Sequence, residues 1–338
     1  MTRPAQRSAE RYGARVWREF KASNRAIWSL RVVVLLAGLA LSADFLANDK
    51  PYWIQLDGEW YFPATIDYGV WAGLRQWPEP LLNADFRQLE TQAAIWPPIP
   101  HSPTRVDLRG GIFSAPSTQH WLGTDRLGRD LAAGLIHGTR ISLTIGLVVV
   151  AIQALIGIAL GALAGYYGGW VDIGISRVIE IMLGIPTFFL LITVAAIFPP
   201  SIYLIMIILG LTGWMGIARF VRSEFLRVRA QDFVESARSL GSSDTRVMAR
   251  HILPNALAPV LVSMSFGVAS AILAESGLSF LGIGVPAHLV TWGSILSEAR
   301  TNTFAWWLAV FPGFAIFATV TAYNLLGDGL RDALDPKT

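Results

Sequence analysis

The residue types that support enzyme chemistry are sparse in this 338-residue chain, and their spacing fits no catalytic or metal site. The absence of cysteine excludes disulfides, thiolate nucleophiles and cysteine-ligated metals. None of the three lysines follows glycine in the pattern with which a P-loop holds phosphate, so we expect no ATP hydrolysis. The histidines lack metal-ligand or acid-base spacing, at positions 101, 120, 137, 251 and 288. We therefore predict a chain that is not an enzyme and binds neither metal nor cofactor.

Two glutamates, Glu180 and Glu275, lie within or near apolar runs, where an ionisable group usually faces a cavity or a partner. Proton coupling is one interpretation, and a solvated or hydrogen-bonded helix end is the other. Both residues lie close to predicted membrane surfaces, which favours the second interpretation. Pro186 should kink its helix, and a helix break can line a pathway. These three residues are our candidates for a translocation pathway.

The composition indicates a polytopic membrane protein. Hydrophobic residues make up 53% of the sequence and charged residues 15%, whereas soluble domains carry roughly 25% charged residues. A membrane span needs about 20 mostly apolar residues. Six segments meet this requirement, so we predict an all-α membrane protein with six transmembrane helices, at residues 27–46, 141–165, 178–198, 201–218, 256–280 and 305–327.

Basic residues predict the orientation of these spans. Lysines and arginines cluster before and at the start of the first span, which places the N-terminus in the cytoplasm. Counting from there puts residues 219–255, with seven arginines, inside and residues 281–304 outside. A secretory signal peptide fits the first span poorly, because the preceding segment is unusually long and no Ala-x-Ala site follows. Since these arginines can meet anionic lipid headgroups, the net charge of +3 requires no nucleic-acid partner.

This topology divides the chain into five parts. We expect a cytoplasmic N-terminal segment, a first transmembrane helix, a periplasmic insertion that ends in an interfacial helix, a five-helix core and a cytoplasmic tail. Their boundaries are 1–26, 27–47, 48–139, 140–327 and 328–338. Both termini are therefore expected in the cytoplasm.

The insertion is too long to be an unstructured connection. Its sequence PYWIQLDGEWYFPATI predicts a β-hairpin around Asp57 and Gly58. We expect its tryptophans to pack a small core or to lie at the membrane interface. Direct contact with a ligand is the less favoured alternative for these residues: Trp53, Trp60, Trp71, Trp77, Trp96 and Trp121.

Residues 219–255 have the pattern of two helices joined by a turn. Apolar residues fall on one face of the first helix, as in an amphipathic surface helix: Phe233, Ala237 and Leu240. Gly241 can end that helix in the left-handed conformation, residues 242–244 can cap a second helix, and Pro254 should stop it. A solvated hairpin is one interpretation. A DNA-binding helix-turn-helix is disfavoured, because membrane spans tether both of its ends.

The same segment resembles the EAA loop of ABC importer permeases. That loop has Glu-Ala-Ala, three residues, Gly, nine residues, Ile, one residue and Leu-Pro. The positions that correspond here are Glu235, Ser236, Ala237, Gly241, His251, Leu253 and Pro254. Ser236 replaces the middle alanine and His251 stands at the isoleucine position. The resemblance implies a coupling helix that docks on an ATPase subunit.

A second motif, HWLGTDRLGRDLAAGLIHGTRISL, resembles the signature of dipeptide and oligopeptide importer permeases. The matching residues at the start of the second span include Gly123, Thr124, Asp125, Gly128, Arg129, Asp130 and Arg140. Matches continue through GYYGGWVD at 165–172 and LAESGLSFLGIGV at 273–285. The resemblance implies the type I, MetI-like fold and a second, homologous permease as partner. It also implies a periplasmic solute-binding protein, a peptide substrate, and ABC ATPase subunits that use ATP and Mg.

Residues 47–51 and 57–63 resemble one branch of this family, associated with oligopeptides and the peptide-nucleotide antibiotic microcin C. A permease for another solute, such as nickel, is the alternative within the family. An ion-coupled secondary transporter is less favoured, because we find neither an internal repeat nor a central charged pair.

Overall fold

The computed structural model describes residues 12–56, 58–82, 84–89, 92–107, 111–286 and 288–334. The chain forms two compact units. The first contains residues up to Val34, residues 145–274 and the residues from Ala318 onward. The second contains residues 35–144 and 275–317 and is called the outer unit below, after its predicted position. The boundaries between the two units fall inside long helices.

Among the described residues, five helical segments are long and apolar enough to cross a membrane. They are α2 (Asn24–Leu41), α5 (Leu131–Tyr167), α8 (Ile202–Arg229), the stretch Asp244–Phe280 that includes α11 (Leu253–Phe280), and α13 (Trp307–Leu334). The third predicted span, 178–198, corresponds to α6 (Gly169–Leu183) and α7 (Thr187–Ile197), which are bent by 68° at the break between them. Pro186 stands directly before α7, so the predicted kink is confirmed as a full break.

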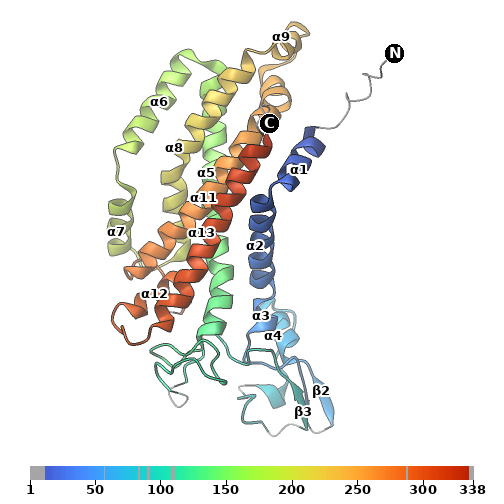
Figure 1. Ribbon diagram of the computed structural model, residues 1–338, viewed down its shortest axis with the longest axis vertical. Helices are drawn as coiled ribbons and strands as arrows, with labels where there is room; N and C mark the ends of the chain where they lie inside the picture. The colour runs from blue at the N-terminus through green and yellow to red at the C-terminus, as the bar shows by residue number, and fades with distance from the viewer. Residues whose placement is uncertain are drawn as a thin grey trace. The chain divides into compact units, whose positions relative to one another are not determined.

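In the first unit, α6 and α7 both pack against α8 (Figure 1). Glycines allow α5 to approach α8 closely. A Cβ atom added to Gly161 would lie 2.5 Å from the Ala218 carbonyl oxygen, and one added to Gly165 would lie 2.6 Å from Phe225 Cβ. Small residues at such spacing let helix backbones pack tightly in a membrane, where no hydrophobic effect drives helices together. The helix α1 (Tyr12–Ala22) adds Phe20 to a small cluster with α13.

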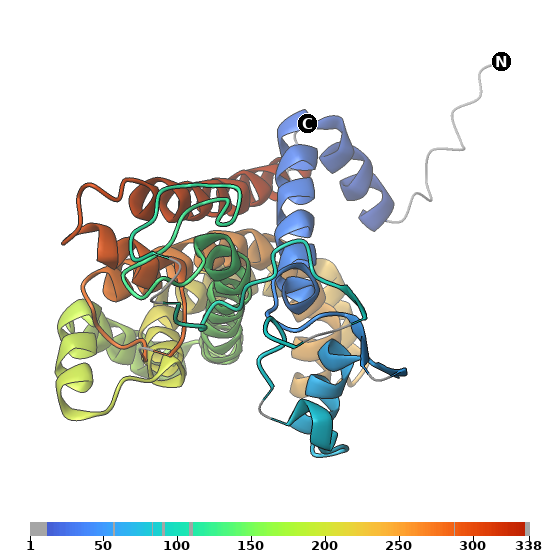
Figure 2. The same cartoon turned by 90° about the horizontal axis from the view of Figure 1, so that it is seen from below.

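The outer unit contains a three-stranded antiparallel sheet with strand order β2-β1-β3. Its strands are β1 (Trp53–Leu56), β2 (Glu59–Tyr61) and β3 (Ala93–Ile95). Leu56 pairs with Glu59, and Gly58 has φ of 83°, so the predicted hairpin is confirmed; Asp57 lies outside the described residues. The short elements α3 (Ala43–Leu46), α4 (Pro63–Trp71) and η1 (Glu79–Leu81) complete this region, and Figure 2 shows α4 beside the sheet.

A small core explains part of the tryptophan content. Ile54, Ile66, Leu81 and Phe86 are buried, and Trp77 and Trp96 pack against them. Trp53 and Trp60 pack on each other with ring centroids 4.8 Å apart, yet Trp60 and Trp121 remain exposed. The side chain of Trp71 lies outside the described residues.

The remaining elements are α9 (Asp232–Ser239), α10 (Asp244–Arg246), the π-helical turn η2 (Val247–Ile252) and α12 (Trp292–Ala299). One prediction is wrong in detail. Pro254 does not stop a helix, since α11 runs through it, and the wider π turn before it provides room for a residue without an amide hydrogen. The amphipathic stretch expected to lead into the second span is the first part of α5, which is continuous from Leu131.

Candidate functional site

The predicted coupling hairpin is a helix, turn and helix built on a buried apolar base. Val234 and Ala237 of α9 are buried in a cluster that contains Phe225, Val228 and Ile252. Glu235 and Ser236 lie on the exposed side of the same helix. The structure therefore fixes α9 by one face and leaves the other face free for a partner.

The exposed side of α9 keeps two large apolar residues. Phe233 is 40% exposed and Leu240 is 87% exposed. This differs from the arrangement that the sequence suggested, in which they would accompany Ala237 on one face. The difference arises because α9 turns its Val234 and Ala237 line, rather than the Phe233 and Leu240 line, toward the rest of the unit. Exposed apolar residues beside an acidic side chain suit a docking surface.

Gly241 ends α9 as predicted. Its φ is 79°, a conformation that glycine adopts without strain. The Ser242 amide donates to the Ala237 carbonyl oxygen at 3.1 Å, and the Gly241 amide donates to the Arg238 carbonyl oxygen at 2.9 Å. These bonds set the sharp turn that joins α9 to the next helix.

Tyr166, at the end of α5, ties the hairpin to the helical core. Its hydroxyl donates to Asp244 Oδ1 at 2.5 Å, and the Arg238 guanidinium lies 4.8 Å above its ring. Arg229 donates to the Tyr166 carbonyl oxygen at 2.5 Å. The sequence motif at 165–172 contains Tyr166, but its distance from the hairpin in sequence concealed this contact.

Two further features surround the hairpin. Arg222 of α8 forms a two-point ion pair with Asp172 of α6, the last residue of the same motif. His251 lies in the π turn, where its carbonyl oxygen accepts a hydrogen bond from Asn255 Nδ2 at 2.7 Å. Leu253 and Pro254 follow at the start of α11. The seven loop residues thus lie on the hairpin, on the π turn that follows it and at the start of α11.

The signature loop before α5 is an interlocked structure rather than an open site. Thr124 is buried, and its Oγ1 accepts from the Ser114 amide and donates to the Gly111 carbonyl oxygen, both at 2.8 Å. Trp307 Nε1 donates to the Thr124 carbonyl oxygen at 3.0 Å. Gly123 has φ of 89°, and a Cβ there would lie 2.7 Å from the Ser114 carbonyl oxygen. Only glycine fits that position.

Asp125 and Arg129 connect this loop to α12. Asp125 Oδ1 accepts from the Leu127 and Arg129 amides at 2.8 and 2.9 Å, while its Oδ2 pairs with Arg129 Nε at 2.5 Å. Arg129 Nη2 also reaches Glu298 Oε1 at 3.3 Å. Burial and the neighbouring Asp125 raise the pKa of Glu298 above its ordinary value. Gly128 has φ of 71° and lies against the Asp107 backbone.

Arg140 binds the end of α2 and the short helix α3 to α5. Its Nε donates to the Ala40 carbonyl oxygen and its Nη2 to Asp44 Oδ2, both at 2.8 Å. Tyr68 also donates to Asp44 Oδ2, at 2.5 Å. Burial raises the pKa of Asp44, but the hydrogen bonds from Arg140 and Tyr68 outweigh it and the net shift is downward. Burial, with the Asp44 contact, raises the pKa of Tyr68 to about 12.

The three candidate pathway residues have different local surroundings. Glu180 is exposed and pairs with Arg177 at 2.5 Å within α6. Glu275 is fully buried and accepts from Ser279 Oγ at 2.6 Å. Pro186 stands at the break between α6 and α7. Their role in a pathway stays a prediction.

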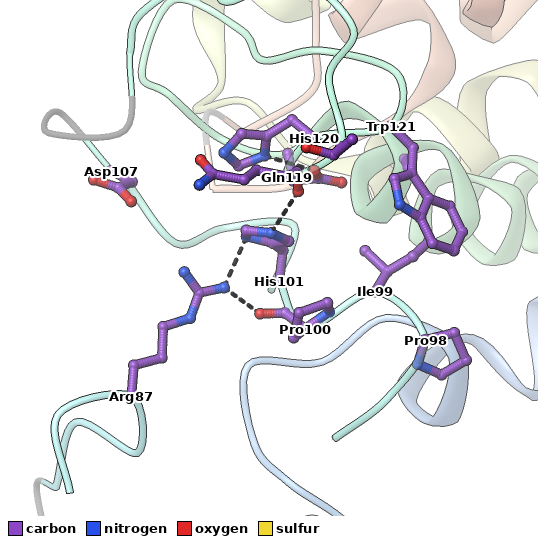
Figure 3. Close-up of a pocket in the computed structure, with 12 residues that line it drawn as sticks. Arg87, Pro98, Ile99, Pro100, His101, Asp107, Gln119, His120 and Trp121 are labelled. Atoms are coloured by element: carbon purple, nitrogen blue, oxygen red, sulfur yellow. Dashed lines mark hydrogen bonds and ion pairs between the residues drawn. The ribbon is translucent and has the colours of Figure 1, made fainter. Parts of the chain in front are cut away.

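One cluster escaped the sequence prediction. His101, His120 and Asp130 lie together on the wall of a cavity of about 390 Å³, although the histidine spacing suggested no such group (Figure 3). Asp130 caps α5 by accepting from the Ala133 amide at 2.8 Å, and its second oxygen pairs with His120 Nδ1 at 2.8 Å. Burial lowers the pKa of His101.

Comparisons with known proteins identify the family. Residues 157–338 match the model for the "Binding-protein-dependent transport system inner membrane component". The chain belongs to this family, so it is a multi-pass inner-membrane permease subunit of an ABC transport system and not an enzyme. Its family implies a solute-binding protein and an ATPase as partners.

Individual relatives extend the match to nearly the whole chain. The inner membrane ABC transporter permease protein YejE of Escherichia coli is 36% identical over 95% of this chain and 96% of its own length. The peptidoglycan transport system permease protein YejE of Agrobacterium fabrum is 34% identical over 96% of this chain and 92% of its own length. The dipeptide transport system permease protein DppC of Alkalihalophilus pseudofirmus is 42% identical over 67% of this chain and 74% of its own length. The YejE permeases are the branch of the family that residues 47–51 and 57–63 were predicted to resemble, and this prediction is confirmed.

Proposed function

We propose that this subunit imports oligopeptides, and that ATP-driven motion reaches its spans through the hairpin of α9. The observation that carries this proposal is the two-sided character of α9. Val234 and Ala237 fix the helix to the core, while Phe233, Glu235 and Leu240 stay exposed. A partner that moves the exposed side must therefore move what the buried side contacts.

Tyr166 and Asp172 extend the same route into the spans. Tyr166 belongs to α5 and contacts Asp244 and Arg238 beside the turn. Asp172 of α6 pairs with Arg222 of α8. The hairpin thus contacts α5 and α8 directly, and α8 is joined in turn to α6.

The proposed orientation places the hairpin in the cytoplasm, the insertion in the periplasm and both termini inside. The arginine clusters support it. Because the chain has no cysteine, single cysteines at exposed positions can report it without background. A membrane-impermeant maleimide added to intact spheroplasts should label Ala115→Cys and spare Ser239→Cys until the membrane is opened. The reverse pattern would overturn the orientation.

We further propose a second, different permease as the pairing subunit and a peptide as cargo. The relatives that support this cargo are named for dipeptide and peptidoglycan transport. Peptide-nucleotides such as microcin C belong to the same chemical class. ATP and Mg would be used by the ATPase and not by this chain.

The test is transport by the complete complex in vesicles. With binding protein outside and ATP inside, a labelled oligopeptide should accumulate, and omission of either component should abolish accumulation. Radioactive nickel, tested in parallel, should not accumulate. Nickel uptake without peptide uptake would replace the proposed cargo.

A further inference from the structure

We propose that His101, His120 and Asp130 form a resident binding site for a divalent transition metal, best suited to Zn²⁺, on the wall of the outer-unit cavity. One ligand atom from each residue lies within 4.8 Å of the others. Two imidazoles and one carboxylate are a donor set that zinc favours, and the adjoining cavity of about 390 Å³ can supply water as a fourth ligand.

The separations suit a metal after a small movement. Ligand atoms around tetrahedral zinc lie roughly 3.3 Å apart, because each bond is about 2.0–2.1 Å long. His120 Nδ1 and Asp130 Oδ2 are already 2.8 Å apart. A metal can replace the proton between them if that proton moves to His120 Nε2, the other nitrogen of the neutral ring. His101 must then approach by up to about 1.5 Å, and it is only half-buried.

Two of the three ligands, His120 and Asp130, are held firmly in place, whereas Arg87 competes with a metal for the third, His101. His120 and Asp130 are buried, and Asp130 is held by its bond to the Ala133 amide. Arg87 Nη2 donates to His101 Nδ1 at 2.8 Å, as Figure 3 shows. That hydrogen bond requires the Nδ1 lone pair and leaves the proton on Nε2, facing the Gln119 carbonyl oxygen at 3.1 Å. Neither nitrogen of His101 can bind a metal until Arg87 moves away.

This competition predicts opposite changes in metal affinity for two kinds of variant, which nonspecific binding of metal to surface residues would not produce. Removing a ligand should weaken metal binding, whereas removing Arg87 should strengthen it. Bound metal would join the segment at 98–101 to the signature loop at the start of α5. The site would thereby fix the earlier part of the insertion to that loop.

The experiment uses the full permease complex, purified with a histidine-free tag and freed of metal by a chelator. Zn²⁺ is titrated and counted by elemental analysis, and Co²⁺ is used to detect a tetrahedral visible spectrum. We expect one tight equivalent in the wild type and at least about tenfold weaker binding in His101→Gln and His120→Gln. Arg87→Gln should bind more tightly than the wild type. His288→Gln, a change of an exposed histidine outside the cavity, should bind as the wild type does.

The result that would overturn the proposal is the same stoichiometry and affinity in His101→Gln as in the wild type, or no tight equivalent at all. If His120→Gln does not assemble, the half-buried His101→Gln and Arg87→Gln decide the matter with their opposite expected directions. The ion should also stay bound during ATP turnover. Its release on turnover would contradict a resident site.

Discussion

Truncation of Leu240 to alanine should weaken the binding of the ATPase to the permease about 30-fold. Leu240 is 87% exposed at the end of α9, so almost all of its side chain is available to a partner. The truncation removes three carbon groups, each worth about 0.8 kcal/mol when buried. Because 87% of the side chain is exposed and can be buried by the partner, the loss is about 2 kcal/mol out of a full value of about 2.4 kcal/mol, which corresponds to roughly 30-fold in Kd.

The assay is a binding titration of the purified ATPase on the permease pair in lipid nanodiscs. Leu74→Ala is the matched control, because Leu74 is 81% exposed but belongs to the insertion. It should leave the Kd unchanged. Since Leu240 makes little contact within the chain, the unfolding temperature of Leu240→Ala should equal that of the wild type. An unchanged Kd in Leu240→Ala would refute the assignment of this side of α9 to docking.

Three further predictions concern the hydrogen bond of Tyr166, the packing of α5 on α8, and an ion pair in the outer unit. Tyr166→Phe removes the hydroxyl bonded to Asp244 and should lower peptide uptake per ATP hydrolysed, measured in vesicles; an unchanged ratio would remove Tyr166 from the coupling route. Gly161→Ala should destabilise the protein by about 1–3 kcal/mol through overpacking on the Ala218 carbonyl. Gly174→Ala, which meets no atom within 4 Å, should not; equal unfolding temperatures would contradict the close approach. The hydrogen bond from Arg105 lowers the pKa of Asp85 below its ordinary 3.8, so this pair stabilises the fold above that pH and is lost as the pH falls through the lower folded value. The difference in unfolding temperature between wild type and Arg105→Gln should therefore be constant from pH 7 to 5 and shrink below pH 3.8; a difference independent of pH would argue against the pair.

Local chemistry made several features predictable from sequence. The φ of 79° at Gly241, the break at Pro186 and the hairpin at Gly58 each follow from the conformational limits of glycine and proline. The apolar runs located the spans, because hydrocarbon requires about 20 apolar residues whatever their neighbours are.

Features that depend on distant contacts were not predictable. Pro254 alone would be expected to end a helix, but the π turn before it lets the helix continue, and no local sequence pattern predicted that turn. The packing side of α9 is decided by Phe225 and Ile252, which flank the hairpin on other helices. His101 and His120 are separated by a loop whose path sets their distance, so no spacing rule could bring them together with Asp130.

The most direct test of ATP coupling through this hairpin is uptake of a labelled oligopeptide by vesicles that contain the complete complex, with Glu235 intact or changed to lysine. Glu235 is exposed on α9, so its reversal should disturb docking without disturbing the core. We predict uptake that requires ATP and is lost in Glu235→Lys. Uptake that persists without ATP and follows an ion gradient would contradict ATP coupling through this hairpin.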